Sequence, residues 1–285
     1  MNHKNYRINS FSNSAKVIST RRLSFEPKDW QITMRDELRS ALKKLKLVTP
    51  DDFLVATYNS PDRTFCDVEN ILMYNVGVSY FRDLTGLGFV LERGFAPVSD
   101  EFDHEMIYQI VPAPYVSKRW DLIEQIGECC FSTPRLMSDL KPADVWRWCK
   151  LGTLTSTHIV EEQVPLCIEV DITPSRGQQF RPANFIKPLL DGLLCAFHTH
   201  NGSNLAILLE RLSSHFQSVP LETIRQWLLN EQHSVLGQRR LLQPFKAGMQ
   251  WNPADDRLVL IHINLHSPSD GTTKIRGTLH ACNLA

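Results

Sequence analysis

Apolar and polar positions along the chain follow an order that predicts alternating strands and helices. The apolar run Phe53–Tyr58 has the length and composition of a buried strand. A loop containing Pro61 follows, and the apolar segment that begins at Ile71 predicts a helix. Two further strands are predicted at Gly88–Leu91 and Met106–Val111. This succession indicates an α/β fold of the mixed α+β kind.

The same order recurs after an ungapped shift of 114 positions. The shift places Asn70 on Asn184 and the run Phe53–Tyr58 on Cys167–Ile172. An apolar helix and two apolar strands again follow, the strands being Leu258–Ile263 and Ile275–Leu279. Residue identity across the shift is almost confined to the asparagine, so the pattern alone predicts an internal duplication of a β-α-β module.

The pattern divides the chain into four parts. Residues 1–25 contain serines and basic residues without an acid. They predict a flexible basic arm that orders on a partner or on nucleic acid, and an organellar transit peptide is the second interpretation. Residues 26–114 form the first copy and residues 115–162 a helical connector. Residues 163–285 form the second copy, which contains a helical insertion at about 201–248.

Amphipathic spacing predicts the helices of the connector and the insertion. The connector helices are Trp120–Ile126 and Lys141–Trp148, and Pro142 favours a helix start in the second of them. The insertion helices are Asn204–Phe216 and Leu221–Gln232. Helical spacing favours core packing over base stacking for three aromatic residues, Trp146, Trp148 and Trp227.

Composition restricts the class of protein. The 285 residues include 31 basic and 31 acidic side chains, so no extensive basic surface for non-specific DNA binding is indicated. A hydrophobic fraction of 42% is sufficient for a packed core. Seven cysteines without a Cys-x-x-Cys pair, and no secretory segment, predict free thiols in the cytoplasm. No stretch has the length of a membrane span, so no membrane partner is expected.

Candidate chemistry begins with Asp67, Glu69 and Asn70, which stand directly before the first predicted helix. Two carboxylates and an amide in this position suit a divalent cation held against a phosphate. A third carboxylate would come from the acidic stretch that ends at Asp103. In the alternative interpretation, Asp67 and Glu69 cap the helix and interact with its dipole.

The second copy resembles a known family. The segments Asn184–Leu193 and Trp251–Val259 are similar to RusA-type Holliday-junction resolvases. That family has an Asp-x-Asp-Asn pattern, a Lys near the helix start, an Asp one turn later, and an Asp-Asp pair before a strand. The resemblance implies a magnesium-dependent endonuclease of small mixed α/β domains that acts on branched DNA as a two-fold dimer.

Each copy matches a different part of the family pattern. In the second copy Lys187, Asp191, Asp255 and Asp256 match, whereas Arg181 and Ala183 replace the two leading aspartates. In the first copy the leading acids and the asparagine match, but the positions of the Lys and the later Asp hold Met73 and Gly77. If the two copies pack about a pseudo-two-fold axis, Lys187 would reach across and complete a composite site.

The resemblance implies roles for these residues. Asp67, Glu69 and Asp103 would hold Mg²⁺, Asn70 would position them, and Lys187 would stabilise charge on the phosphate. Asp191, Asp255 and Asp256 would be remnants of the second site, and Arg181 with Lys187 would contact nucleic acid. We therefore expect a nucleic-acid-associated subunit of a larger protein assembly, with DNA preferred to RNA. An active magnesium-dependent endonuclease is the alternative.

Other polar residues permit two interpretations. Asp255 and Asp256 follow Asn252 and Pro253, a composition that is typical of a turn. The histidines are expected to be structural or surface residues rather than metal ligands, namely His198, His200, His262 and His266. Alternation places Glu169, Asp171 and Thr173 on one strand face, where they line a groove or face water.

Overall fold

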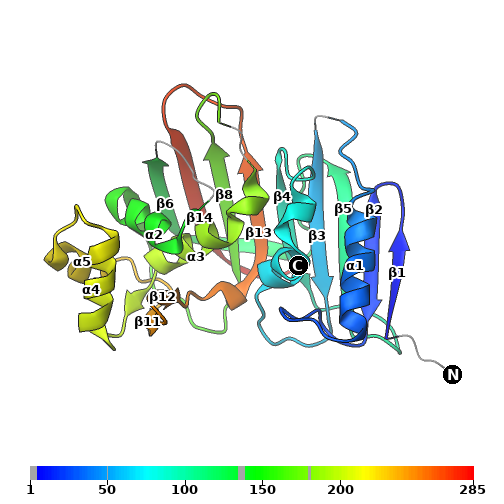
Figure 1. Cartoon of the computed structure of the whole chain (residues 1–285), viewed down its shortest axis with the longest axis horizontal. Coiled ribbons are helices and arrows are strands. Elements are labelled where there is room, and N and C mark those ends of the chain that lie inside the picture. The colour runs from blue at the N-terminus through cyan, green and yellow to red at the C-terminus, as the bar shows by residue number, and fades with distance from the viewer. Residues whose placement is uncertain (1–4, 50, 134–138, 179–180) are drawn as a thin grey trace.

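A computed structural model describes residues 5–49, 51–133, 139–178 and 181–285, in which a ten-stranded mixed sheet carries helices on one face (Figure 1). The strands of the first half are β1 (Tyr6–Ser10), β2 (Ser14–Ser19), β3 (Asp52–Asn59), β4 (Gly88–Gly94) and β5 (His104–Pro112). Those of the second half are β6 (Trp120–Thr133), β7 (Thr153–Ser156), β8 (Leu166–Thr173), β13 (Leu258–Leu265) and β14 (Thr273–Leu284). The mixed α/β class expected from the pattern is confirmed.

The two halves of the sheet use the same pairing scheme. The strand order is β1-β2-β5-β3-β4-β13-β8-β14-β6-β7. In the first half β5 pairs antiparallel with β2 and β3, and β3 pairs parallel with β4. In the second half β14 pairs antiparallel with β6 and β8, and β8 pairs parallel with β13. The antiparallel pair of β4 and β13 joins the halves, so the order of the second half mirrors that of the first.

Strands β3 and β8 have the same length of 8 residues and are separated by the shift of 114 positions. Every residue of β3 is buried, because its neighbours cover both sides. Alternate residues of β8 are buried, and the intervening residues Glu169, Asp171 and Thr173 are half-buried, whereas Cys167 is buried. The positions of both strands are confirmed. A common ancestry of the two halves stays a prediction.

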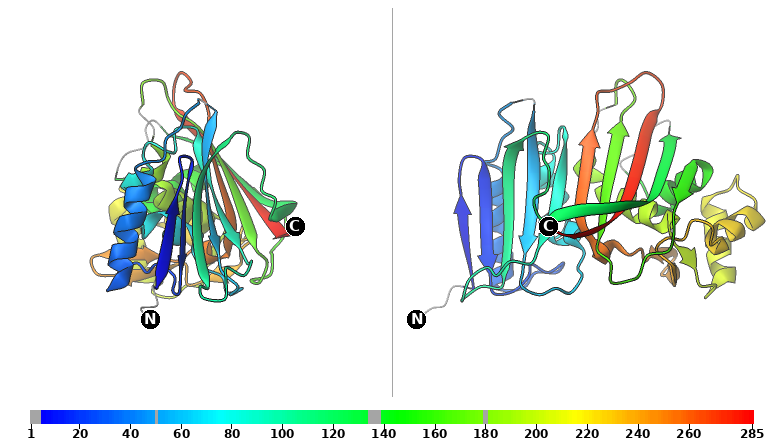
Figure 2. Two further views of the ribbon diagram at one scale, coloured as in Figure 1. Left: turned by 90° about the vertical axis from the view of Figure 1, so that its right-hand side faces the viewer. Right: turned by 180° about the vertical axis from the view of Figure 1, so that it is seen from behind.

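Helices cover one face of the sheet (Figure 2). Helix α1 (Trp30–Leu42) buries Met34, Leu38 and Leu42 at helical spacing. A π-helix, η1 (Asn70–Tyr74), follows β3, and the 3-10 helix η2 (Val78–Phe81) follows it. The second half contributes α2 (Pro142–Leu151), the 3-10 helix η3 (Pro182–Asn184) and α3 (Ile186–Ala196). Gly192 lets α2 and α3 pack closely, because an added Cβ would lie 2.4 Å from the Cβ of Val145.

The insertion lies between α3 and β13 at one end of the molecule (Figure 1). Its helices α4 (Leu205–His215) and α5 (Leu221–Leu229) agree with the predicted positions. Short strands and a 3-10 helix complete it, namely β9 (Thr199–His200), β10 (Gln238–Arg239), β11 (Leu242–Phe245), β12 (Gly248–Trp251) and η4 (Asp255–Arg257). Trp146 of α2 is fully buried and packs edge-on against Trp227 at 5.8 Å between ring centroids, which confirms its role in the core.

The expectation of a flexible arm at residues 1–25 is wrong for the described residues 5–25. Strands β1 and β2 form the edge of the sheet, and Ala15 and Val17 are fully buried. Two of the basic residues pair within the first half, since Lys16 contacts Glu105 and Arg7 contacts Glu101. Alternating apolar residues between the basic ones allow the segment to join the sheet.

The expectation of an entirely helical connector at 115–162 is also wrong. Residues Trp120–Ile126 lie in β6, which pairs with β14, so the second half begins inside the predicted connector. Leu122 and Ile123 are exposed, although an amphipathic helix would bury them. Cross-strand pairing along β14 outweighs the weak helical periodicity of this segment. The second connector helix, α2, is present as predicted.

The face of the sheet opposite the helices is covered only in part. The beginning of β6 and the end of β14 bend across it near the C-terminus (Figure 2). Under them lies a smaller apolar cluster that contains Trp120, Cys282, Phe53, Cys167 and Val259. None of the seven described cysteine thiols forms a disulfide. Among the described helices, none combines the length and the apolar character needed to cross a bilayer.

Candidate functional site

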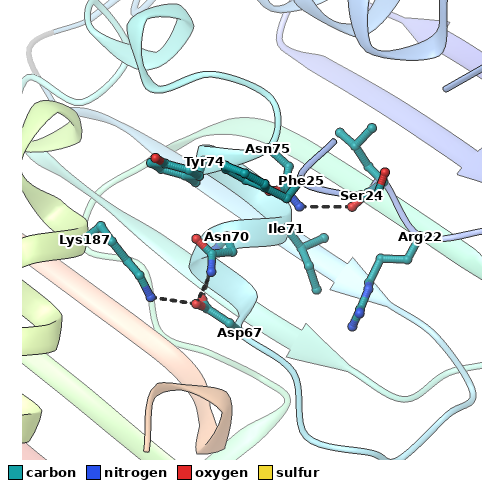
Figure 3. Close-up of a pocket in the computed structure, with 10 residues that line it drawn as sticks. Arg22, Ser24, Phe25, Asp67, Asn70, Ile71, Tyr74, Asn75 and Lys187 are labelled. Atoms are coloured by element: carbon teal, nitrogen blue, oxygen red, sulfur yellow. Dashed lines mark hydrogen bonds and ion pairs between the residues drawn. The ribbon is translucent and has the colours of Figure 1, made fainter. Parts of the chain in front are cut away.

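The ammonium group of Lys187 is surrounded by carboxylates from both halves of the chain. Its Nζ lies 2.7 Å from Asp67, 2.5 Å from Asp255 and 3.2 Å from Asp191. Glu69 is the fourth acid, with Oε2 at 4.0 Å. We call Asp67, Glu69, Asp191 and Asp255 the acidic cluster. Lys187 reaches across to the first half, as expected for a composite arrangement (Figure 3).

Asp67 is held by the start of the π-helix that follows β3. Its Oδ1 accepts a hydrogen bond of 2.9 Å from the backbone N–H of Asn70, and its Oδ2 accepts one from the Asn70 side chain. These two hydrogen bonds agree with the capping interpretation of Asp67, and its second contact is the ion pair with Lys187. The π-helix itself is closed by the Asn75 N–H donating to the Asn70 carbonyl at 2.8 Å.

Glu69 is the least satisfied member of the cluster. The residue is 2% exposed, and neither carboxylate oxygen has a hydrogen-bond partner among the described residues. Burial, together with the negative charge of Asp67, raises the pKa of Glu69 well above its ordinary value. An ionised carboxylate without donors is unstable in such surroundings, so this side chain requires a proton or an additional cation.

Asp191 and Asp255 enter the cluster from the second half. Asp191 lies one turn after Lys187 on α3, and burial raises its pKa to about 7. Asp255 begins the 3-10 helix before β13. The preceding residue, Ala254, donates its backbone N–H to Nε2 of His198 at 3.2 Å, which fixes this turn. Asp255 is thus placed by tertiary contacts across the insertion.

Negative charge exceeds positive charge at this point of the structure. Burial alone would lower the pKa of Lys187, but the four carboxylates raise it above its ordinary value, so the amine is protonated. One ammonium then faces four acids that lie within 4.0 Å of it. Burial also raises the pKa of Asp67. A buried charge without a partner destabilises the fold. Removing one partner of a buried ion pair lowers the free energy of unfolding by roughly 3 to 5 kcal/mol.

Three residues with predicted roles lie outside the cluster. Asp103 is exposed directly before β5 and makes no described contact with Lys187. Asp256 is exposed beside Asp255, since consecutive residues of the 3-10 helix point in different directions. Arg181 is exposed before η3 and pairs with no acid in the described part of the chain. The predicted metal-ligand set that includes Asp103 is therefore not brought together.

A pocket of about 720 Å³ opens beside Lys187 and Asp67 (Figure 3). It is lined on the other side by Arg22, Phe25 and Tyr74. The rings of Phe25 and Tyr74 stack at 5.6 Å between centroids and 11° between planes. None of these lining residues was predicted from the sequence, because Arg22 and Phe25 stand in the expected arm and Tyr74 in the apolar helix after Asn70. The only local signal was an arginine and an aromatic residue in a segment without acids.

The histidines serve the fold. Burial lowers the pKa of His198 to about 3, so its ring is neutral and bonds with the Gly237 carbonyl and the Ala254 N–H. His200 is fully buried and lies 2.8 Å from the carbonyl oxygen of Ser203. On the partly covered face of the sheet, His262 and His280 lie 4.0 and 3.7 Å from Glu169. The structural interpretation of His198 and His200 is confirmed.

No protein-family model matches the chain, and no curated protein sequence matches it. Within the described residues, no group of three or more His, Cys, Asp or Glu side chains has an arrangement suited to a metal ion. In the acidic cluster the ammonium of Lys187 occupies the centre. The site is therefore a carboxylate cluster with an internal counter-ion and an adjoining pocket.

Proposed function

We propose that the chain is a divalent-cation-dependent endonuclease whose catalytic site is the acidic cluster. The observation that carries this proposal is Glu69, a buried carboxylate without a hydrogen-bond partner that shares one ammonium with three other acids. Without a further cation, the negative charge of the cluster is reduced by protonation, and the pKa values of Asp67, Glu69 and Asp191 are accordingly raised. Acids with perturbed pKa values occur at catalytic sites and in structural ion-pair networks alike, and the pocket that adjoins Asp67 and Lys187 favours the catalytic interpretation.

In the arrangement described, Lys187 occupies the centre of the acidic cluster, so a site for a hard cation such as Mg²⁺ requires a rearrangement of these side chains. All four acids offer oxygen, the ligand atom that Mg²⁺ prefers. For a cation to enter, Lys187 must leave the centre of the cluster, and its side chain also lines the pocket. When bound, such a cation would neutralise negative charge on the phosphate and lower the pKa of a water molecule bound to it. Asp67, Glu69 and Asp255 would hold it.

The remaining two side chains have roles in the reaction. Asp191, with a pKa of about 7, is suited to accept a proton from water near neutral pH. The water oxygen forms a bond to phosphorus while the bond from phosphorus to the leaving oxygen breaks, and that oxygen takes a proton from solvent. Lys187 then donates to a non-bridging phosphate oxygen, whose negative charge it stabilises.

The matching pairing schemes of the two halves support a fusion of two resolvase-like modules. The first half supplies Asp67 and Glu69, and the second supplies Lys187, Asp191 and Asp255. A single composite site would thus combine what each half retains of the RusA-type pattern. The same resemblance makes branched DNA the first substrate to test. The free cysteine thiols support a reducing compartment such as the cytoplasm.

A second candidate function is that of a nucleic-acid-binding subunit without catalysis. It is favoured by the position of Lys187, which contacts three carboxylates directly and already neutralises part of the cluster. A site that keeps this ion pair would be structural. The formal net charge of zero also favours a subunit that binds nucleic acid together with protein partners.

The test is incubation of the purified chain with branched, single-stranded and duplex DNA and with RNA, in Mg²⁺, Mn²⁺ or EDTA. Asp255→Asn and Asp256→Asn form a matched pair, because the residues are adjacent but only Asp255 contacts Lys187. We expect metal-dependent cutting that Asp255→Asn and the double variant Asp67→Asn, Glu69→Gln abolish. Asp256→Asn and Asp103→Asn should cut like the unmodified chain.

The outcomes separate the two candidates. Cutting that survives the double change at Asp67 and Glu69 would exclude the acidic cluster as the catalytic site. Binding without cutting, in the unmodified chain and in the double variant alike, would support the subunit. Loss of cutting in both Asp255→Asn and Asp256→Asn would point to the turn rather than to the carboxylate.

A further inference from the structure

The pocket beside the acidic cluster contains two aromatic side chains that the core does not use. Phe25 is 63% exposed and Tyr74 is 46% exposed, although large apolar rings are usually buried. Neither residue is among the buried or half-buried apolar residues of the two core clusters. The two rings come from distant parts of the chain and stack on each other. Packing of the fold therefore does not account for this pair.

The positions of the neighbouring residues connect the pair to phosphate chemistry. Phe25 and Tyr74 line the same pocket as Asp67 and Lys187, and Arg22 lines it too (Figure 3). Arg22 is exposed, its charge acts on Cys66 and Asp62, and no acid of the described residues forms an ion pair with it. A guanidinium group of this kind suits a phosphate oxygen. The pocket volume of about 720 Å³ is in the range of small-ligand sites, roughly 300 to 1,000 Å³.

These features suit the parts of a nucleotide. The aromatic pair suits the base, the arginine suits the phosphate, and the acidic cluster adjoins the place of the next phosphodiester. A base has an apolar face that stacks on aromatic rings, and this interaction tolerates any sequence. In a duplex, neighbouring bases already cover both faces of each base. Only an unpaired nucleotide, at a loop, a branch point or a single strand, presents a free face to such a platform.

We propose that the Phe25–Tyr74 pair stacks an unpaired base, that Arg22 binds the phosphate of that nucleotide, and that the adjoining phosphodiester thereby reaches the acidic cluster. This inference rests on the proposed function, and it assigns the substrate class as nucleic acid with unpaired nucleotides. The platform selects the strand to be cut by its lack of pairing. Continuous duplex is bound weakly because it offers no free base.

The first test measures binding separately from cutting. Fluorescence anisotropy is recorded in EDTA with a labelled single-stranded oligonucleotide, with its duplex, and with the same duplex carrying a short unpaired loop. The variants are Phe25→Ala, Tyr74→Ala and Arg22→Gln. Phe11→Ala is the matched control, because Phe11 is also 63% exposed but does not line the pocket. Urea unfolding of each variant checks that it is folded.

We expect each aromatic substitution to weaken binding of the single strand and the loop by about ten-fold, and to leave duplex binding unchanged. Phe25→Trp should retain binding, since it keeps a stacking surface. Equal affinity of the unmodified chain for duplex and single strand would overturn the inference. So would an equal loss in Phe11→Ala, or the absence of any oligonucleotide binding. Selective binding without metal-dependent cutting would retain the platform and remove only the hydrolysis.

Discussion

Glu69 provides the sharpest test of the charge imbalance in the acidic cluster. Replacing Glu69 by Gln keeps the shape of the side chain and removes its charge. In the folded protein the carboxylate is 2% exposed, without a donor, and 4.0 Å from a single ammonium that three other acids also contact. At that distance one ion pair contributes about 4 kcal/mol at an effective dielectric constant of 20. Burial and three like charges offset this attraction.

The sign of the effect follows from the direction of the pKa shift. Burial raises the pKa of Glu69 above its unfolded value. The protonated carboxyl therefore stabilises the fold at pH values below the unfolded pKa, and this stability is lost as the pH rises towards the folded pKa. We expect Glu69→Gln to raise the free energy of unfolding by about 1–3 kcal/mol at pH 8 without divalent cations. At pH 4 the gain should largely vanish.

The assay is thermal or urea unfolding at pH 4 and pH 8 in EDTA, where each kcal/mol corresponds to about 2–4 °C for a chain of this size class. Glu101→Gln is the control, because Glu101 is exposed and pairs with Arg7 at the surface. It should change stability by less than about 1 kcal/mol at either pH. A Glu69→Gln variant that is less stable than the unmodified chain at pH 8 would show that the buried carboxylate does not destabilise the fold.

Three further predictions concern the same cluster and its supports. Lys187→Met should lower the free energy of unfolding by about 3–5 kcal/mol at pH 8, measured by urea unfolding, because it leaves the acids without a cation; an unchanged midpoint would contradict this. Adding Mg²⁺ at pH 8 should raise the melting temperature of the unmodified chain by several degrees. The rise should be smaller at pH 5, because Asp191, with a pKa of about 7, is then protonated and the cluster carries less negative charge. An equal rise in the double variant at Asp67 and Glu69 would place the cation elsewhere. Gly192→Ala should lower the free energy of unfolding by about 1–3 kcal/mol in the same assay, because the added Cβ would lie 2.4 Å from the Cβ of Val145 and 2.7 Å from the Pro142 carbonyl oxygen. An unchanged free energy would mean that α2 and α3 separate without cost.

Much of the secondary structure could be predicted because it is encoded by local periodicity. The strands β3 and β8, the insertion helices and the burial of Trp146 follow from runs and spacings within short windows. The segments that were misjudged depend on distant partners. Residues 6–19 became strands because β5 offers an edge, and residues 120–126 became a strand because β14 extends beside them.

The acidic residues could be found in the sequence, but their grouping could not. Asp67 and Glu69 stand out because they directly precede an apolar helix, and Lys187 and Asp191 because they are one helical turn apart. The sequence distance gave no reason to choose Asp255 over Asp256 or Asp103. That choice depends on which side of a 3-10 turn or a strand end faces the helical layer.

Local patterns along the chain thus established the order of strands and helices, the similar succession in both halves, and the residues able to carry the chemistry. Only the tertiary structure decided that β4 and β13 join the halves, so that Lys187 lies 2.7 Å from Asp67 across 120 positions of sequence. The physical reason is range. Side-chain periodicity and helix capping act within a few residues, whereas strand pairing and the meeting of buried charges follow from how whole elements pack.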